Sequence, residues 1–315
     1  MIKKLQHLAE YGFVRLLIAV AQTLPEDRAD AICRHLAVLF SDGLRIRHAT
    51  VDGNLRRVYP EKTEAERAIL RRQMWHHLLL MLCEIAWAPR RLHRCNWRQH
   101  FRFIDAPTLL RVLLSRRPAV LVTGHFGNFE LGGYVTGLMG IRTMTIARTL
   151  DNPYLHAFLG RFRGAKMQRM VDKNGCAPEI ERHLGEGGKL ALLADQYGGA
   201  KGCWVDFLGH QASCHKALAL FTLTADAPML VAYTRRSGGP MQFEQGSTGI
   251  VDPRDSALAR GGVRPLTEWY NERLGVAIQR DPDQYWWLHR RWRAKPKRVR
   301  RPPAEAAPEP ARRVA

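Results

Sequence analysis

The sequence has no run of 18 or more apolar residues, so no segment is predicted to span a membrane. Its start, Lys3 and Lys4 followed by an apolar stretch, superficially resembles a signal peptide. Arg15 interrupts that stretch, and the residues after Thr23 make a poor cleavage site. Two interpretations stay open: an amphipathic helix lying in a membrane interface, and an ordinary first helix packed on the core.

Cysteine is scarce, and none of the six residues belongs to a Cys-x-x-Cys pair. Their separate hydrophobic or mixed surroundings predict reduced thiols of a cytosol-facing protein, most of them packed in the core. We therefore expect neither a disulfide framework nor a metal site. The six are Cys33, Cys83, Cys95, Cys176, Cys203 and Cys214.

Acidic residues are too few to balance the basic ones. The chain has 29 Asp and Glu against 49 Lys and Arg, a net charge of +20. Such a charge favours a negatively charged partner: nucleic acid, an anionic membrane surface, an acidic protein or a phosphorylated substrate. With 46% hydrophobic residues in 315, the chain is predicted to be globular, as one large domain or two small ones.

The amino-terminal part has helical patterning. Pro25 and the acids after it indicate a helix start. Thr63 and Glu66 have the spacing of a capping box, and the helix they open is predicted to reach about Ala88. Its expected apolar side comprises Ile69, Leu70, Met74, Leu78, Met81, Leu82 and Ile85.

After about residue 100, short apolar runs alternate with helical windows. Strands are predicted at 119–123, 143–147, 190–194 and 229–233, and helices near 128–139, 151–162, 177–186, 213–225 and 264–280. This alternation predicts an α/β fold with a mainly parallel central sheet flanked by helices. We expect a helical, membrane-associating portion over 1–98, an α/β domain over 99–294 and a basic disordered tail over 295–315.

A glycine-rich turn directly after the first of these strands holds the most informative residues, Gly124-His-Phe-Gly-Asn-Phe-Glu. Asn128 is a plausible N-cap of the following helix, and Glu130 lies in its first turn. We expect the Glu130 carboxylate to turn back onto the His125 ring and raise the basicity of its other nitrogen. His125 is then a candidate general base at the carboxyl end of a strand.

These residues resemble the late acyltransferases of lipid A biosynthesis, the lauroyl/myristoyl group, within the wider lysophospholipid acyltransferase-like superfamily. The resemblance covers nearly the whole chain and consists of motifs that follow one another in the same order as in the family. They are the His125–Glu130 turn, Asn54-Leu-Arg-Arg-Val-Tyr-Pro-Glu, Arg148 with Asp151-Asn-Pro, Arg161-Phe-Arg-Gly, Leu193-Ala-Asp-Gln-Tyr-Gly-Gly, Phe207-Leu-Gly, and Pro282-Asp-Gln-Tyr-Trp-Trp-Leu-His-Arg-Arg-Trp. One departure is the segment 212–217, which has Lys216 and lacks the family's usual glycine.

The resemblance implies a glycerol-3-phosphate acyltransferase-like fold and acyl transfer from an acyl thioester to a lipid hydroxyl, with no cofactor beyond the donor, acyl-ACP or acyl-CoA. His125 would be the general base, oriented by Glu130. Arg148 and Arg163, with Arg161 a competitor, would bind phosphate or stabilise the oxyanion. Asp195 would order an arginine, with Asn128 and Gln196 as supports.

The implied partners are acyl carrier protein, an anionic membrane surface and a phosphorylated glycolipid acceptor, at the cytoplasmic face of the bacterial inner membrane. Acceptors such as a phosphatidylinositol mannoside or an aminolipid remain alternatives. The basic segment 290–301, which includes Trp292, also suits a nucleic-acid binder. No accompanying nucleic-acid motif is present, and juxtamembrane attraction to anionic lipid explains the segment equally, so nucleic acid is not expected as a partner.

Overall fold

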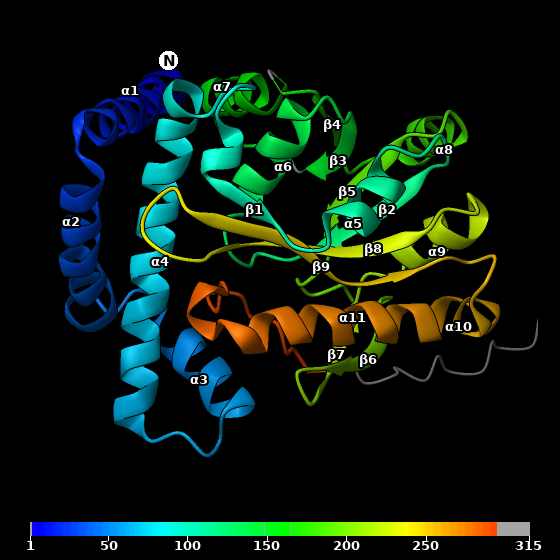
Figure 1. Cartoon of the computed structure of the whole chain (residues 1–315). Coiled ribbons are helices and arrows are strands. Elements are labelled where there is room, and N and C mark those ends of the chain that lie inside the picture. The colour runs from blue at the N-terminus through cyan, green and yellow to red at the C-terminus, as the bar shows by residue number, and fades with distance from the viewer. Residues whose placement is uncertain (1, 148, 165, 295–315) are drawn as a thin grey trace, which may run out of the picture.

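The computed structural model describes residues 2–147, 149–164 and 166–294. Helices make up its amino-terminal part, at one side of the molecule in Figure 1. They are α1 (Ile2–Thr23), α2 (Glu26–Val38), the π-helical η1 (Leu39–Gly43), α3 (His48–Val58) and α4 (Glu64–Arg91). The predicted tail over 295–315 lies outside the described residues.

Helix α4 begins where its sequence predicts. The Thr63 side chain accepts a hydrogen bond from the Glu66 backbone, and the Glu66 carboxylate accepts one from the Thr63 backbone, which confirms the capping box. Most of the expected apolar side is buried, but Ile69 is 52% exposed and Leu82 is 60% exposed. Those two predictions are wrong because each lies just beside the buried stripe of the helix.

A seven-stranded sheet occupies the middle of the molecule in the order β1-β9-β8-β2-β5-β3-β4. From β8 to β4 neighbouring strands are parallel, whereas β9 is antiparallel to β8, so a mainly parallel sheet is confirmed. The strands are β1 (Phe101–Phe103), β2 (Ala119–Thr123), β3 (Thr143–Ala147), β4 (Gln168–Asp172), β5 (Lys189–Leu193), β8 (Met229–Arg236) and β9 (Phe243–Val251).

Four of the strands were expected, with β5 shifted by one residue and β8 longer than predicted. Strands β1, β4 and β9 were not, nor was the separate antiparallel hairpin of β6 (Cys203–Phe207) and β7 (His210–Cys214). Residues 213 and 214, expected in a helix, therefore end β7. Polar residues interrupt the apolar pattern of β4 and β9, which weakens their sequence signal.

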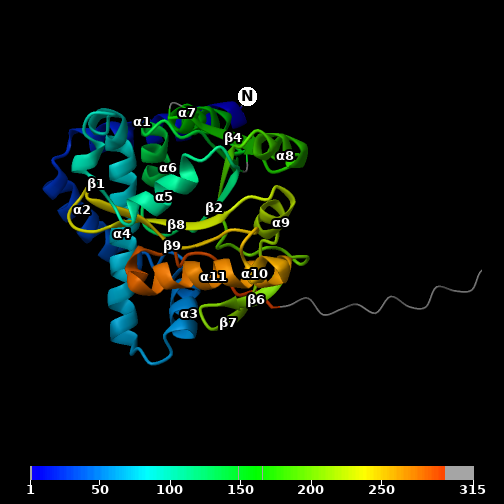
Figure 2. The ribbon, with the colours of Figure 1, turned by 45° about the vertical axis from the view of Figure 1, so that its right-hand side comes forward.

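Helices cover both faces of the sheet. Helices α5 and α6 lie on one side, and α9 and α11 on the other with the β6–β7 hairpin, as Figure 2 shows. The remaining elements are η2 (Trp97–Gln99), α5 (Ala106–Leu113), α6 (Phe129–Leu138), α7 (Pro153–Gly164), α8 (Ala177–Gly185), α9 (Ala217–Thr224), α10 (Ala257–Arg260), α11 (Val263–Arg280) and η3 (Pro282–Gln284).

The sheet and the amino-terminal helices share one apolar core. Leu55 of α3 and Met74 of α4 belong to the same buried cluster as Val122 of β2 and Ile278 of α11. The division of the chain at residue 98 therefore stays a prediction. All six cysteines are free thiols; the Sγ atoms of Cys33 and Cys83 lie 3.9 Å apart.

Helix α1 packs on α4 and α7 and still exposes apolar side chains. Trp87 donates its Nε1–H to the Ala21 carbonyl at 2.6 Å, which ties the end of α1 to α4. Among the helices that the structure describes, none combines the length and apolarity needed to cross a bilayer. The exposed apolar side chains of α1 are Leu5, Leu8, Phe13, Leu16, Leu17 and Val20.

Candidate active site

The turn between β2 and α6 carries His125, and a close contact requires one of its two glycines, Gly127, whereas Gly124 packs tightly. Gly127 has φ +58°, and a Cβ there would lie 1.9 Å from the Thr234 carbonyl oxygen. A Cβ on Gly124 would lie 3.3 Å from Asp195. The turn is therefore pressed against β8 on one side, where only glycine fits, and against the residues after β5 on the other.

Asp195 holds the His125 ring. Its Oδ1 lies 2.8 Å from His125 Nδ1, and its Oδ2 accepts a hydrogen bond from the His125 backbone N–H at 2.9 Å. Asp195 follows β5, which pairs with β2 in the register Thr123 to Leu193, so the two strand ends bring the residues together. The Nδ1–H donates to the carboxylate, which leaves Nε2 as the basic nitrogen.

The charged forms of His125 and Asp195 stabilise each other. Burial by itself would lower the pKa of His125, but the Asp195 carboxylate and its hydrogen bond raise it more, so the pKa lies above 6.5. Burial would raise the pKa of Asp195, yet His125 outweighs it and brings that pKa to about 2. Asp195 is accordingly a permanent anion under a histidine of raised basicity.

Gln196 and His289 lie on the Nε2 side of His125. Gln196 Nε2 is 3.3 Å from His125 Nε2 and 2.8 Å from His289 Nε2. A carboxamide nitrogen only donates, so both imidazole nitrogens accept. Burial and then the charge of His125 lower the pKa of His289, which keeps it neutral. The Trp286 ring meets the His125 ring edge-on, with centroids 5.2 Å apart.

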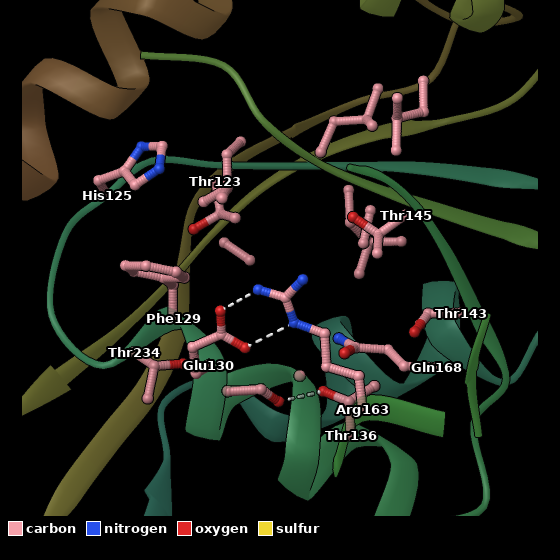
Figure 3. Close-up of a pocket in the computed structure, with 18 of the residues that line it drawn as sticks. Thr123, His125, Phe129, Glu130, Thr136, Thr143, Thr145, Arg163, Gln168 and Thr234 are labelled. Atoms are coloured by element: carbon pink, nitrogen blue, oxygen red, sulfur yellow. Dashed lines mark hydrogen bonds and ion pairs between the residues drawn. The ribbon is translucent and has the colours of Figure 1, made fainter. Parts of the chain in front are cut away.

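The Glu130 carboxylate makes no hydrogen bond to the His125 ring, so the expected contact is wrong, although its charge does contribute to the raised pKa of His125. Its carboxylate is bound in a two-pronged ion pair by Arg163 of α7, with Arg163 Nε 2.9 Å from Oε2 and Nη2 on Oε1 (Figure 3). Both side chains are largely buried, with 13% of Glu130 and 16% of Arg163 exposed. Glu130, in the first turn of α6, points toward Arg163 of α7 and not back toward the turn that carries His125.

The other predicted residues divide between support and surface. Asn128 caps α6, accepting from the Leu131 backbone at 3.1 Å, and is fully buried. Gln196 lies in the site, as expected of a support. Asp195 orders His125 instead of an arginine. Arg161 is exposed on α7, and Arg148 lies outside the described residues.

A buried polar network behind the turn was not anticipated. Asn128 Nδ2 donates to Glu84 Oε2 at 2.9 Å, and Arg236 binds both Glu84 oxygens. Arg236 also contacts His77 Nδ1 at 2.9 Å, and His77 Nε2 reaches the Gly127 carbonyl at 3.3 Å. Helix α4 and strand β8 thus fix the backbone on both sides of the turn. Glu84 and His77 sit within an amphipathic pattern, so nothing local distinguishes them from surface residues.

The carboxyl-terminal segment braces the same turn from outside. The Gly127 N–H donates to the Gln284 carbonyl, and the Trp286 N–H donates to the His125 carbonyl, both at 2.9 Å. Asn54 Nδ2 donates to the carbonyls of Trp287 and His289 at 2.8 and 2.7 Å. Two motifs at opposite ends of the sequence therefore meet in one place. The motif that contains His289 was visible in the sequence together with the Asn54 motif, and this was the available signal that His289 belongs to the site.

A cavity of about 330 Å³ opens at His125 and runs between the sheet and α6 (Figure 3). Phe129, Glu130 and Arg163 line it near the turn, and threonine and glutamine side chains line much of the rest. The volume equals that of about eleven waters at ~30 Å³ each, enough for a chain on the order of ten carbons. No three His, Cys, Asp or Glu side chains within the described ranges are grouped to hold a metal ion.

Comparisons with known proteins find a family and relatives that match most of the chain. The sequence model of the family described as "Bacterial lipid A biosynthesis acyltransferase" matches residues 2–294. The chain is 25% identical to the lipid A biosynthesis palmitoleoyltransferase of Escherichia coli K12 over 263 residues, 80% of this chain and 81% of that protein. It is also 25% identical to the lipid A biosynthesis lauroyltransferase of the same organism over 269 residues, 81% and 82% of the two chains.

Among solved structures, the 1-acyl-sn-glycerophosphate acyltransferase of Thermotoga maritima aligns with a TM-score of 0.38 and 11% identity. The alignment covers 84% of this chain and 100% of that one.

Proposed function

Because the chain belongs to the bacterial lipid A biosynthesis acyltransferase family, we propose that it transfers a fatty acyl chain from acyl carrier protein to a hydroxyl of a lipid A precursor. The observation that carries the proposal is the hydrogen bond from His125 Nδ1 to Asp195, which presents Nε2 as a base at the cavity mouth. Acyl transfer to a hydroxyl needs such a base beside a site for the acyl chain.

The acyl group passes directly from the thioester to the acceptor, without an acyl-enzyme. The acceptor hydroxyl takes the place of Gln196 on His125 Nε2 and gives up its proton as its oxygen attacks the thioester carbonyl. The carbon–sulfur bond of the tetrahedral intermediate then breaks, and His125 returns the proton to the leaving thiolate. Asp195 stabilises the imidazolium between the two steps, the role first expected of Glu130.

For the acceptor's phosphate groups we propose Arg148 and Arg161. Arg163 has its guanidinium engaged by Glu130, whereas Arg161, two residues earlier on the same helix, is exposed. Arginine suits phosphate because it presents a planar fork of donors. The Glu130–Arg163 pair then shapes the cavity instead of binding the acceptor directly.

The proposed place of action is the surface of the bacterial inner membrane, on its cytoplasmic face. Support comes from the exposed apolar side chains of α1, among them Phe13, Leu16 and Leu17, each at least half exposed. Lys3, Lys4 and Arg15 lie on the same helix, as in helices that rest in an anionic interface. An acidic carrier protein would also be attracted to a chain of net charge +20.

Mass spectrometry of lipid A and total lipids, from cells with and without the gene, tests the proposal. The expected result is a lipid A species that loses the mass of one acyl chain when the gene is deleted. Transfer of label from acyl carrier protein to the isolated precursor by the purified protein links that change to the enzyme. A mass change confined to a phosphatidylinositol mannoside or an aminolipid would show that this lipid, and not a lipid A precursor, is the acceptor. No change in any lipid would contradict acyl transfer.

A further inference from the structure

The cavity beside His125 has walls that are partly apolar and partly formed by threonine and glutamine, and we propose that it binds an acyl chain that carries a hydroxyl group. This inference rests on the proposed function and names its donor more closely, as a hydroxyacyl thioester. Leu121, Leu193 and Ala232 suit the hydrocarbon part of such a chain, whereas a plain chain has no group that can bond to the threonine hydroxyls or glutamine carboxamides.

The threonines and the glutamine of the strands lie on the face of the sheet that lines the cavity. Alternate residues of a strand point to opposite faces. Toward the cavity the strands present Thr123 of β2, Thr143 and Thr145 of β3, Thr234 of β8 and Gln245 of β9. On the other face Val122, Met144 and Val231 belong to the apolar core, and the buried Glu244 is bonded to Tyr233 and Arg235.

The helix that closes the cavity is fitted to these polar side chains. A Cβ on Gly132 of α6 would lie 2.3 Å from Thr234 Oγ1, and one on Gly133 would lie 2.1 Å from Gln168 Nε2. Two successive glycines thus let α6 approach as closely as the threonine and glutamine permit. A chain in this space runs directly beside hydrogen-bonding groups.

Gln245 supplies the specific contact. Its side chain is 7% exposed, and its Nε2 donates to Thr136 Oγ1 at 3.3 Å, while the Thr136 hydroxyl donates to the Gly132 carbonyl at 2.8 Å. These bonds leave Gln245 Oε1 buried, with no hydrogen-bond partner among the residues that the structure describes. Because Gln245 lines the cavity, a turn of its carboxamide brings this sealed oxygen to the chain, where a hydroxyl donates to it and a methylene cannot.

The test compares donors that differ by one oxygen. The purified full chain is given dodecanoyl-acyl carrier protein and its 2-hydroxy, 3-hydroxy and mid-chain hydroxy forms, with the lipid A precursor as acceptor. We expect kcat/KM for at least one hydroxylated donor to exceed that for dodecanoyl by tenfold or more, because a site built to bond a hydroxyl discriminates against the analogue without it. In Gln245→Leu that ratio should fall to one or below.

Thr248→Val is the matched control. Thr248 lies on the same strand, its Oγ1 is also buried without a partner, and it does not line the cavity, so the donor preference should be unchanged. Faster transfer of dodecanoyl than of every hydroxylated form, with the same order in Gln245→Leu, overturns the hydroxyl site and leaves the proposed function standing. Failure of all the donors overturns the proposed function itself.

Discussion

Asp195 Oδ1 lies 2.8 Å from His125 Nδ1 although 70 residues separate the two along the chain. The contact exists because β2 and β5 are adjacent parallel strands, and each is followed at its carboxyl end by one member of the pair. It decides which ring nitrogen is basic, and it raises the pKa of His125. Much of the expected behaviour of the enzyme follows from it.

The first prediction concerns the dependence of rate on pH. In the proposed mechanism His125 is a base only when neutral, so kcat should rise as the pH increases through its pKa, which is raised above 6.5. Asp195→Asn removes the charge that raises this pKa and keeps the burial that lowers it. The acidic limb of the profile should therefore move to lower pH, while the maximal rate also falls because the tautomer is no longer fixed. An acidic limb that does not shift in Asp195→Asn would show that Asp195 does not raise the pKa of the titrating group.

His125→Ala should lower kcat by roughly 100- to 10,000-fold, the range of a general base, without altering the thermal midpoint of unfolding greatly. A radiolabelled acyl-donor assay measures the rate. His93→Ala is the control, since His93 is exposed and lies outside the cavity, and it should retain wild-type activity. Normal transfer by His125→Ala would remove the mechanism.

The Glu130–Arg163 pair should be coupled in stability. Breaking it from either side leaves a largely buried charge without its partner. We expect Glu130→Gln and Arg163→Met each to reduce the free energy of unfolding, and the double variant to lose less than the sum, with a coupling energy of about 1 kcal/mol or more. Urea titration of the four proteins completes the cycle; additive losses would show that the pair contributes no mutual stabilisation.

Glu84 should matter for stability. It has no exposed surface and binds Arg236 and Asn128, so Glu84→Ala leaves a buried guanidinium unpaired and should cost about 3 kcal/mol. Calorimetry or urea titration measures the loss. The conservative Glu84→Gln should recover part of it. Glu61→Gln, on an exposed carboxylate, is the matched control and should be nearly neutral.

Replacing Leu16 and Leu17 of α1 by glutamine should weaken flotation of the protein with anionic liposomes, because both side chains are more than half exposed and contribute to the apolar face of the helix. Leu114→Gln changes an equally exposed leucine on another part of the molecule and should leave flotation unchanged. Retention of nucleic acid in a gel shift, without binding to liposomes, would favour the nucleic-acid alternative.

Regular elements were predictable because their patterns are local. The four expected strands and the capped start of α4 depend on periodicity and on neighbours three residues apart, and both survive in the structure. Strand β9 was missed because polar residues and glycines fill its middle although it is largely buried, so its sequence resembles that of a loop.

Partners across the sheet were not predictable in the same way. Glu130 is five residues from His125, and a local turn seemed able to join them; the strand order instead places Asp195 at the ring and sends Glu130 to Arg163. Both carboxylates were singled out from the sequence. Their roles were exchanged because strand order is a non-local property that spacing does not contain.

The contacts of residues 284–289 with the turn that carries His125 have a consequence for the synthesis of the protein. Gln284 and Trp286 hold the backbone of Gly127 and His125, and His289 meets Gln196 beside the ring. A ribosome that has made β2, β5 and Asp195 has therefore made the catalytic pair without the segment that immobilises it. The nascent chain should acquire activity only when residues 284–289 emerge, after both His125 and Asp195 have been synthesised.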